Sequence, residues 1–459
     1  MNADKIVQQL CQCGYEAYIV GGAVRDMLLN KDPEDEDVVT NASPEEIATI
    51  FKEEKIDLVG ASFLVTLVNG IEVSTYRKDI NKKPGRENCE VTQCETLLED
   101  LHKRDFTINA IATCPYTGEI IDPFNGQKDL QNKVIKFVGD PNKRIYEDYL
   151  RMIRAARFCA LLNATLDFDS SMAIIENRHL VKQIAPERIR LELLKVMGYE
   201  KPSIFFDVLH ETGILNLLLP DLDKMYGHDG GKYHDETLDK HFKMTGDNLP
   251  PDDKILRLAG YLHDIGKPIS YSITNGESFI NHEKYGAALL GGILRRLKFS
   301  NAEIYRIENL VRFHMRSLAG DITDKSVRKM LRKFKENNVD WNDWLRLKIA
   351  DKKANLKNPD YTDEEIKSFV LKIKNALEHK NKAFSVKDLN INGHDIMSIT
   401  NLPQGKHIGN ILDHLLNLVI DTPELNTNEE LTRIVNANFN FKESENDKDC
   451  IKEISGSNG

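Results

Sequence analysis

The stretch Tyr18-Ile-Val-Gly-Gly-Ala-Val-Arg-Asp-Met-Leu-Leu29 is followed, after a short connection, by Pro33-Glu-Asp-Glu-Asp-Val-Val-Thr40. An apolar run that suits a strand enters the Gly21-Gly22 turn, and a helix-like segment then carries Arg25 and Asp26. Glycines let the backbone approach a ligand closely, and the N–H groups that open the next helix favour anions. Although a Gly-Gly pair alone usually marks a plain turn, a nearby arginine that can bond phosphate makes this stretch a candidate phosphate cradle.

Two carboxylates, Asp35 and Asp37, lie two positions apart ahead of Val38-Val39. If they lie on one strand, its alternation puts both on the same face, about 7 Å apart. Two oxygen ligands that face one way suit a hard cation such as Mg²⁺. Solvated acids are the usual explanation of such a pair, but its position after the glycine turn favours a metal site.

Length and composition indicate a globular protein of two to four domains, with 459 residues, 41% of them hydrophobic. The net charge of −10 argues against a protein that grips nucleic acid over its whole surface, although a basic patch is compatible with it. We expect no signal peptide and no membrane span, because no run approaches 18 apolar residues. The seven cysteines are scattered without a zinc pattern, so we expect reduced thiols and a cytoplasmic location.

Asn69-Gly70 separates two strand-forming runs, 63–68 and 71–77, and predicts a β-hairpin. On its second strand Glu72 shares a face with Ser74, so it is either a third metal-site carboxylate or an exposed strand residue. We predict a mobile loop over 78–90. The expected fold of residues 1–140 is a mostly antiparallel sheet with flanking helices, including a helix that starts at Ser43-Pro44.

Arg104-Asp105 precedes an apolar stretch that contains Asn109. The adjacent charges suit either a surface ion pair or, beside a phosphate cradle, a site in which Arg104 binds a triphosphate and Asp105 a ribose hydroxyl.

From Arg144 onward the pattern is helical, and Asp148, Arg151 and Arg154 recur three apart on one predicted helix over 147–158. A solvated helix face explains this spacing. A sharper interpretation is that a carboxylate acceptor beside an arginine donor matches the pairing edges of cytosine and adenine and refuses uracil and guanine. A helix from Pro186 would brace the first.

In order and spacing, five motifs resemble those of bacterial class II tRNA nucleotidyltransferases and poly(A) polymerases. They are Gly21-Gly22-x-x-Arg25-Asp26, Asp35-x-Asp37, Arg104-Asp105, Glu147-Asp148-x-x-Arg151 and Glu187-Arg188. The resemblance implies that the catalytic Asp35 and Asp37 hold Mg²⁺. It implies a nucleotide site formed by Gly22, Arg25, Arg104, Asp105, Asn109, Asp148, Arg151 and Arg154.

Two departures from the family pattern are Lys103, where a second arginine is usual, and the 78–90 loop, which lacks the usual tyrosines. In this family the loop affects the switch from C to A addition. Addition of A alone or of CC alone, and a poly(A) polymerase, therefore stay as alternatives to CCA addition.

Residues 228–355 carry six of the thirteen histidines, among them His234. The order His241, His263-Asp264, Asp351 resembles the HD phosphohydrolase domain, with His282 and His314 as further candidate ligands. The resemblance implies a second divalent metal (Mn²⁺, Ni²⁺ or Mg²⁺) and water attack on a phosphoester. A chain that is only such a phosphohydrolase, acting on nucleotides or RNA ends, is the alternative from another class.

The predicted fold class is α+β, with a sheet-containing nucleotidyltransferase head followed by all-helical domains. The predicted activity is template-independent addition of C, C and A to the 3′ end of tRNA from CTP and ATP. We expect the protein to bind no membrane and to have no stable protein partner. The predicted divisions are a head (1–140), a neck that selects the base and binds RNA (141–225), an HD-type domain (226–360), an RNA-binding tail (361–441) and a disordered end (442–459).

Overall fold

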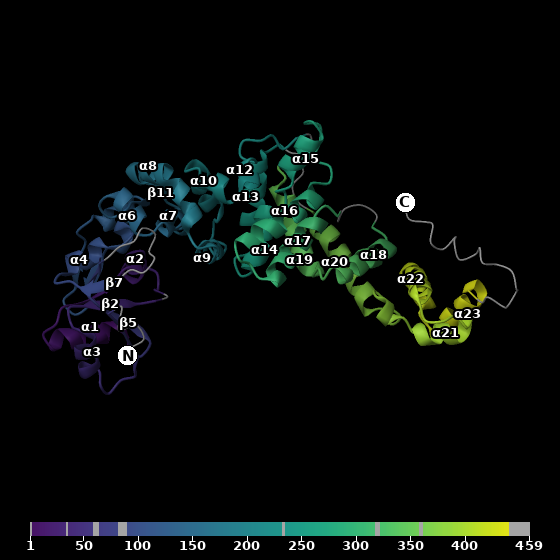
Figure 1. The fold of residues 1–459 in the computed structure, drawn as a ribbon, viewed down its shortest axis with the longest axis horizontal. Helices are drawn as coiled ribbons and strands as arrows, with labels where there is room; N and C mark the ends of the chain where they lie inside the picture. The colour runs from purple at the N-terminus through teal and green to yellow at the C-terminus, as the bar shows by residue number, and fades with distance from the viewer. Residues whose placement is uncertain are drawn as a thin grey trace. The chain divides into compact units, whose positions relative to one another are not determined.

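The computed structural model describes residues 2–33, 35–57, 64–80, 90–231, 235–316, 322–357 and 361–439. The chain divides into two compact units, residues 1–312 with 353–358, and residues 313–352 with 359–459. The main sheet lies in the N-terminal part of the first unit, where Figure 1 labels its strands β2 and β5 among helices α1 to α4. Beyond residue 166 the described elements are all helical, as the sequence predicts.

The head is built on a seven-stranded sheet of order β3-β4-β5-β2-β1-β8-β9. All neighbouring pairs are antiparallel except β2 with β5, which confirms the mostly antiparallel sheet. Asn69 and Gly70 both have positive φ, as a tight turn between antiparallel strands requires, so the predicted hairpin forms. The strands are β1 (Ala17–Val20), β2 (Asp37–Thr40), β3 (Ile56–Asp57), β4 (Val65–Val68), β5 (Ile71–Thr75), β8 (Ala112–Cys114) and β9 (Glu119–Ile121).

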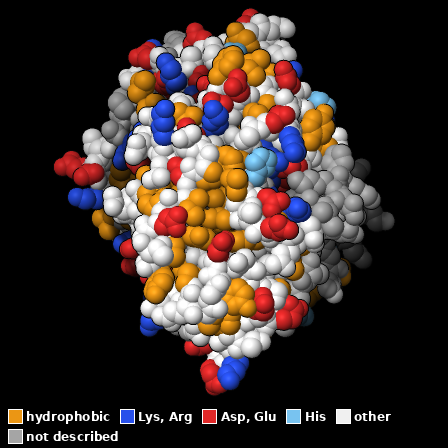
Figure 2. Space-filling view, turned by 90° about the vertical axis from the view of Figure 1, so that its left-hand side faces the viewer, with side chains coloured by type: hydrophobic (Ala, Val, Ile, Leu, Met, Phe, Trp, Pro, Cys, Tyr) orange, Lys and Arg blue, Asp and Glu red, His pale blue; other side chains and the backbone are white. Residues whose placement is uncertain are grey.

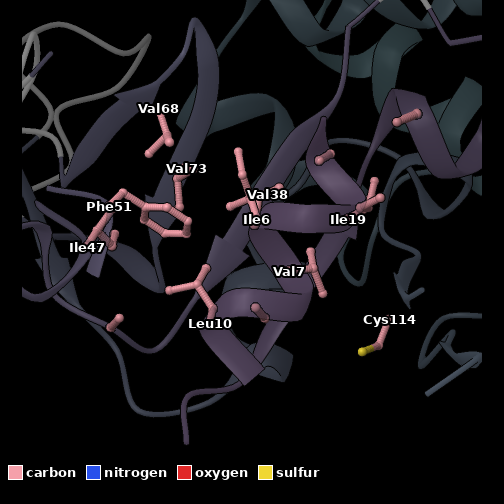
Figure 3. Close-up of a cluster of buried hydrophobic side chains, with 14 of the residues drawn as sticks. Ile6, Val7, Leu10, Ile19, Val38, Ile47, Phe51, Val68, Val73 and Cys114 are labelled. Carbon is pink, nitrogen blue, oxygen red and sulfur yellow. The ribbon is translucent and has the colours of Figure 1, made fainter. Parts of the chain in front are cut away.

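Both faces of the central strands are covered by apolar side chains. Val38 belongs to a cluster with Ile6, Leu10 and Phe51, drawn in Figure 3, whereas Val39 belongs to a second cluster with Leu101 and Val138. Strand alternation therefore puts Asp37 on the same side as Val39. Helices of the head are α1 (Ala3–Gln12), α2 (Gly22–Leu28), α3 (Pro44–Ile50), α4 (Leu97–His102), α5 (Gly126–Gln131) and the short 3₁₀ helix Thr107–Asn109.

The predicted helix start at Ser43-Pro44 is confirmed, because Ser43 and Glu46 form a capping box at the start of α3. The predicted loop over 78–90 is wrong at its ends: β6 (Arg77–Ile80) pairs antiparallel with β7 (Glu90–Gln93), and positions 81–89 lie outside the described residues.

Helices fill the remainder of the first unit, and α9 begins at Pro186 as predicted. A small parallel pair, β10 (Val134–Ile135) with β11 (Thr165–Leu166), joins the head to these helices. They are α6 (Pro141–Glu147), α7 (Leu150–Leu162), α8 (Phe168–Asn177), the 3₁₀ helix Arg178–Gln183, α9 (Pro186–Val196), α10 (Ser203–Glu211), α11 (Ile214–Leu218), α12 (Pro220–Asp223), α13 (Leu238–Asp247), α14 (Lys254–Leu262), α15 (Lys267–Ile273), α16 (His282–Arg296) and α17 (Asn301–Phe313).

The second unit is helical and has its own core, in which Ile396, Leu415, Leu416 and Leu431 are buried. Its elements are α18 (Asp324–Glu336), α19 (Trp341–Ala354, whose last residues belong to the first unit), α20 (Asp363–Glu378), α21 (Gly393–Thr400), α22 (Lys406–Asp421), α23 (Asn428–Phe439) and the 3₁₀ helices Val386–Asp388 and Pro423–Leu425.

Among the described helices, none combines the length and the apolar character that a membrane crossing requires. Figure 2 shows one face of the molecule, on which Lys and Arg side chains lie among Asp and Glu side chains. The described cysteines Cys11, Cys13, Cys94, Cys114 and Cys159 are free thiols.

Candidate active site

Asp37 is the first residue of β2, and it lies opposite Glu72 in the parallel register of β2 with β5. Burial, followed by the neighbouring charge of Glu72, raises the pKa of Asp37, and Asp35 adds to the rise while Arg104 opposes it. Carboxylates that repel one another at a half-buried position are the electrostatic signature of a cation site. Two carboxylates from neighbouring strands thus lie opposite one another here, and the charge of Asp35, just before the first strand, acts on Asp37.

Asp35 lies before the strand rather than on it, because β2 begins only at Asp37. The prediction that strand alternation brings Asp35 and Asp37 to one face is therefore wrong in its mechanism, although the charge of Asp35 still acts on Asp37. Glu72 accepts a hydrogen bond from Ser74 Oγ at 3.1 Å, and its carboxylate lies 3.8 Å from Arg77. The prediction that Glu72 and Ser74 share a face is confirmed.

Gly21 adopts a positive φ of 76° immediately before α2, and a Cβ there would lie 2.7 Å from Arg104 Nη1. Only glycine tolerates both the backbone conformation and this approach. Gly22 opens α2, and behind it the buried Arg25 donates to Asn109 Oδ1 at 2.9 Å. The turn therefore packs against both arginines, Arg104 at Gly21 and Arg25 at Gly22, and Arg104 also acts on the carboxylate of Asp37.

Gly21→Ala is expected to reduce nucleotide binding more than it reduces stability. The positive φ costs about 1–2 kcal/mol, and Arg104, the flexible group that the new Cβ meets, must move away. Gly118→Ala is the matched control, since Gly118 has a φ of 75° with nothing within 4 Å of the added Cβ. Thermal unfolding should show similar losses for both variants, whereas nucleotide binding should weaken only for Gly21→Ala; equal binding by both would contradict the role of Arg104.

Asp105 is buried and held by charged hydrogen bonds. Arg154 donates to its Oδ2 from Nε at 2.8 Å and from Nη2 at 2.5 Å, and Asn109 donates to Oδ1 at 3.1 Å. Burial alone would raise the pKa of Asp105, but Arg154 and Asn109 outweigh it, and Arg151 contributes, so the pKa falls to about 2. Asp105 is thus an ionised acceptor at neutral pH, as a ribose hydroxyl would require.

Because its pKa is lowered on folding, Asp105 stabilises the fold above its ordinary pKa of 3.8, and this contribution disappears as the pH falls toward about 2. Asp105→Asn is expected to cost about 2 kcal/mol at pH 7. Thermal midpoints measured from pH 7 downward should differ most at neutral pH and converge below pH 4. A constant difference would contradict the ionised state of Asp105.

The predicted continuous helix over 147–158 is wrong, because α6 ends at Glu147 and α7 begins at Leu150, with Asp148 extended between them. The break lets Asp148 Oδ2 accept from Arg188 Nη2 of α9 at 2.7 Å. The predicted bracing by the helix from Pro186 is thus confirmed. Arg151 bonds instead to Glu147 Oε2 at 2.7 Å.

Asp148, Arg151, Arg154 and Asp105 nevertheless form one electrostatic group. Arg151 helps to lower the pKa of Asp105, and Asp148 helps to raise the pKa of Arg154, after Asp105 itself. The structure therefore brings together the residues that the motifs placed far apart in sequence.

Sequence reasoning missed Asp100, which is fully buried on α4 and anchors the residues around the site. It accepts from Lys103 Nζ at 2.5 Å and from the Arg77 backbone N–H at 3.2 Å, and lies 3.8 Å from Arg104. Its spacing, four residues before Arg104, is the signal that could have found it.

A second cluster is centred on the buried Asp264, at the end of α14. The Nε2 atoms of three buried histidines lie near its carboxylate: His241 at 3.7 Å, His263 at 3.2 Å and His282 at 3.1 Å. Nδ1 of His263 bonds the Gly260 carbonyl and Nδ1 of His282 the Phe279 carbonyl, both at 2.8 Å. Histidines that metals bind are commonly held through their other nitrogen in this way.

His241 is oriented by Glu236, whose Oε1 lies 3.1 Å from its Nδ1. Burial opposes the ionisation of Asp264, but His263 and Lys267 hold its pKa well below the usual range. Lys267 Nζ lies 2.6 Å from Asp264, a partner that the sequence did not suggest. His234 lies outside the described residues, and His314 and Asp351 belong to the second unit, so their part in this site stays a prediction.

Three family models match successive parts of the chain. The poly A polymerase head domain matches residues 17–136, the span that contains the carboxylates and Arg104-Asp105. The probable RNA and SrmB-binding site of polymerase A matches residues 164–226, and the HD domain matches residues 231–357.

Curated proteins that this chain resembles are named CCA-adding enzymes. That of Geobacillus sp. (strain WCH70) is 44% identical over 220 residues, which cover 47% of this chain and 54% of the relative. That of Lactobacillus helveticus (strain DPC 4571) is 43% identical over 199 residues, covering 43% and 49%. The chain thus matches about half the length of these relatives.

Solved structures extend the likeness along the chain. A crystal structure of the Bacillus stearothermophilus CCA-adding enzyme in complex with CTP has a TM-score of 0.65 at 25% identity and covers 94% of this chain and 95% of that one. A Thermotoga maritima CCA-adding enzyme complexed with tRNA has a TM-score of 0.54 at 21% identity, covering 95% and 94%, and shows the shared fold.

Proposed function

We propose that this chain is a template-independent nucleotidyltransferase that adds C, C and A to the 3′ end of tRNA from CTP and ATP and releases pyrophosphate. The observation that carries the proposal is the meeting of Asp35, Asp37 and Glu72 beside Arg104, with the Asp148–Arg151 group close to Asp105. The relatives named CCA-adding enzymes, one of them solved with CTP, support the choice of substrates.

The carboxylate set fits magnesium, because burial and the charges of Glu72 and Asp35 raise the pKa of Asp37, and a bound cation would offset that repulsion. Asp35 and Asp37 would hold two Mg²⁺ ions, which would activate the RNA 3′-hydroxyl and neutralise charge on the α-phosphate and the departing pyrophosphate. Arg104 and Arg25 bind triphosphate oxygens, and the ionised Asp105 accepts a ribose hydroxyl.

Asp148 and Arg151 choose the base in this proposal. The carboxylate accepts from the exocyclic amino group that cytosine and adenine share, and the guanidinium donates to the ring nitrogen beside it. Uracil and guanine present a carbonyl and an N–H at these positions, so they leave both groups unsatisfied. The proposed division into head (1–140), neck (141–225), HD-type domain (226–360) and tail (361–441) assigns RNA binding to the neck and the tail.

The test uses tRNAs that end before each of the last three nucleotides, incubated separately with labelled CTP and labelled ATP. We expect C on the two shorter substrates and A on the longest. Incorporation of A alone or of CC alone would select the narrower alternatives, and long A tracts would select a poly(A) polymerase. Incorporation of neither nucleotide would overturn the proposal.

A second activity is favoured by the Asp264 cluster. We propose that His241, His263, Asp264 and Asp351, with His282 and His314, hold a divalent metal, and that the site hydrolyses phosphoesters of nucleotides or RNA ends. Three buried histidines that turn Nε2 toward one carboxylate suit such a metal. With Mn²⁺, Ni²⁺ or Mg²⁺ added, we expect the chain to release phosphate or to open a nucleoside 2′,3′-cyclic phosphate. The His263→Ala variant should lose this activity.

A further inference from the structure

Arg144 is a buried arginine, 2% exposed on α6, to which the sequence motifs assign no role. Its Nη2 lies 2.5 Å from Glu147 Oε1, and its Nη1 donates to the His102 carbonyl at 2.7 Å. Its own carbonyl accepts from Arg151 Nη1 at 2.9 Å. Arg144 therefore contacts both Arg151 and the carboxylate that holds it.

Arg151 donates hydrogen bonds to three acceptors of the protein. Its Nη1 donates to the Arg144 carbonyl and to Glu147 Oε2 at 2.7 Å, and its Nη2 donates to the Lys103 carbonyl at 2.9 Å. These bonds use both Nη1 hydrogens and one on Nη2. Within the described part of the chain, the second Nη2 hydrogen and the Nε hydrogen are left for a base.

Arg144 and Arg151 each donate to a backbone carbonyl at the end of α4: Arg144 to that of His102 and Arg151 to that of Lys103. The last carbonyls of a helix have no partner within the helix, and cations favour this end of its dipole. Arg144 and Arg151 supply both the hydrogen bonds and the charge. Because Arg104-Asp105 follow directly, the two arginines tie the neck helices to the backbone that carries the proposed triphosphate and ribose contacts.

Glu147 can orient Arg151 only if its own carboxylate is fixed. Its side chain is 6% exposed, so water does little to balance its charge, and its two oxygens are shared between Arg144 and Arg151. The planar guanidinium of Arg144 bridges Glu147 to the His102 carbonyl, which a flexible lysine cannot do with the same geometry. Removing Arg144 would take away the bond to Glu147 Oε1, so that Glu147 and Arg151 would be held less rigidly relative to α4.

We propose that Arg144 is a positioning residue for base selection: through Glu147 it fixes the plane of the Arg151 guanidinium relative to Arg104-Asp105. The inference rests on the proposed nucleotidyl transfer and adds to it a residue that sets specificity without touching the substrate. Its loss should therefore reduce the discrimination between bases rather than all turnover equally.

The experiment measures single-nucleotide incorporation into tRNAs that lack the last nucleotide or the last two, with each of the four nucleoside triphosphates. Arg144→Met should lower the preference for CTP over UTP, and for ATP over GTP, on the order of tenfold. Arg144→Lys should fall between Arg144→Met and the unmodified chain. Since Arg144 and Glu147 act through one path, the double variant with Glu147→Gln should lose no more discrimination than the worse single variant.

Arg257→Lys is the matched control, because Arg257 is also 2% exposed and binds backbone carbonyls of Gly246, Met197 and Glu200. It should lower the thermal midpoint without changing the nucleotide preference. An unchanged preference in both Arg144 variants, additive losses in the double variant, or an equal loss of preference in Arg257→Lys would overturn the inference. If Arg144→Met does not fold, the discrimination between bases is measured on Arg144→Lys instead, because lysine retains the positive charge. Failure of the unmodified chain to incorporate C or A would instead overturn the proposed function.

Discussion

Asp37→Asn is expected to abolish nucleotide incorporation while leaving the fold at least as stable as before. The rate should fall roughly a thousandfold, since several kcal/mol of transition-state stabilisation depend on the cation that this carboxylate holds. Because burial and Glu72 raise the pKa of Asp37, its ionised form is unfavourable in the fold. A neutral amide of the same shape removes that repulsion, so the thermal midpoint should stay constant or rise.

The matched control is Asp32→Asn, an exposed carboxylate of the same stretch, which should leave both incorporation and the thermal midpoint unchanged. Asp35→Ala should behave like Asp37→Asn in incorporation. Glu72→Gln should cause a smaller loss, because Glu72 is shared with Arg77 and Ser74. Near-normal incorporation by Asp35→Ala or Asp37→Asn would show that the head does not catalyse the transfer.

Asp264→Asn is expected to destabilise the first unit and to remove metal binding by the HD-type site. Lys267 is 4% exposed and lies 2.6 Å from Asp264, so the substitution leaves a buried cation without its counter-charge. Breaking a buried pair in this way costs about 3–5 kcal/mol. The thermal midpoint should fall, and added Mn²⁺ or Ni²⁺ should no longer raise it.

Replacing both partners separates the two effects. Asp264→Asn combined with Lys267→Met removes the uncompensated charge and should recover much of the thermal midpoint, because exchanging a whole buried pair is often neutral. Metal-dependent stabilisation and phosphoester hydrolysis should stay lost, while incorporation at the head continues. Stabilisation by Mn²⁺ that persists in the double variant would show that Asp264 is not a ligand.

Elements set by neighbouring residues were predictable. The Asn69-Gly70 turn and the Ser43 cap depend on hydrogen bonds and dihedral angles within a few residues, and both form as the sequence predicts. The helix over 147–158 failed for the opposite reason. Its apolar spacing is compatible with one continuous helix, and its break at Asp148 accompanies an ion pair with Arg188, forty positions away.

The residues of the two sites also fall into those that the sequence indicated and those that it did not. Residue types and motif order named Asp35, Asp37, Arg104, Asp105 and the histidines around Asp264, because chemistry limits which side chains bind phosphates and metals. The sequence did not indicate how Arg144 supports Arg151, since one of its bonds reaches a backbone carbonyl, and any residue type can supply a carbonyl.

The local elements and the available chemical groups therefore follow from the residues alone: a glycine turn before a helix, acids at the start of a strand, and acidic and basic side chains over 147–154. Packing of the whole unit was needed to place Asp37 opposite Glu72, to bring Arg154 to Asp105 so that its pKa is low, and to bind Arg151 through Glu147 and two backbone carbonyls. The two groups of features differ in how far apart along the chain the interacting residues lie. Turns and caps are closed by adjacent residues, whereas strand register and buried charge depend on partners that are brought together only when the whole unit packs.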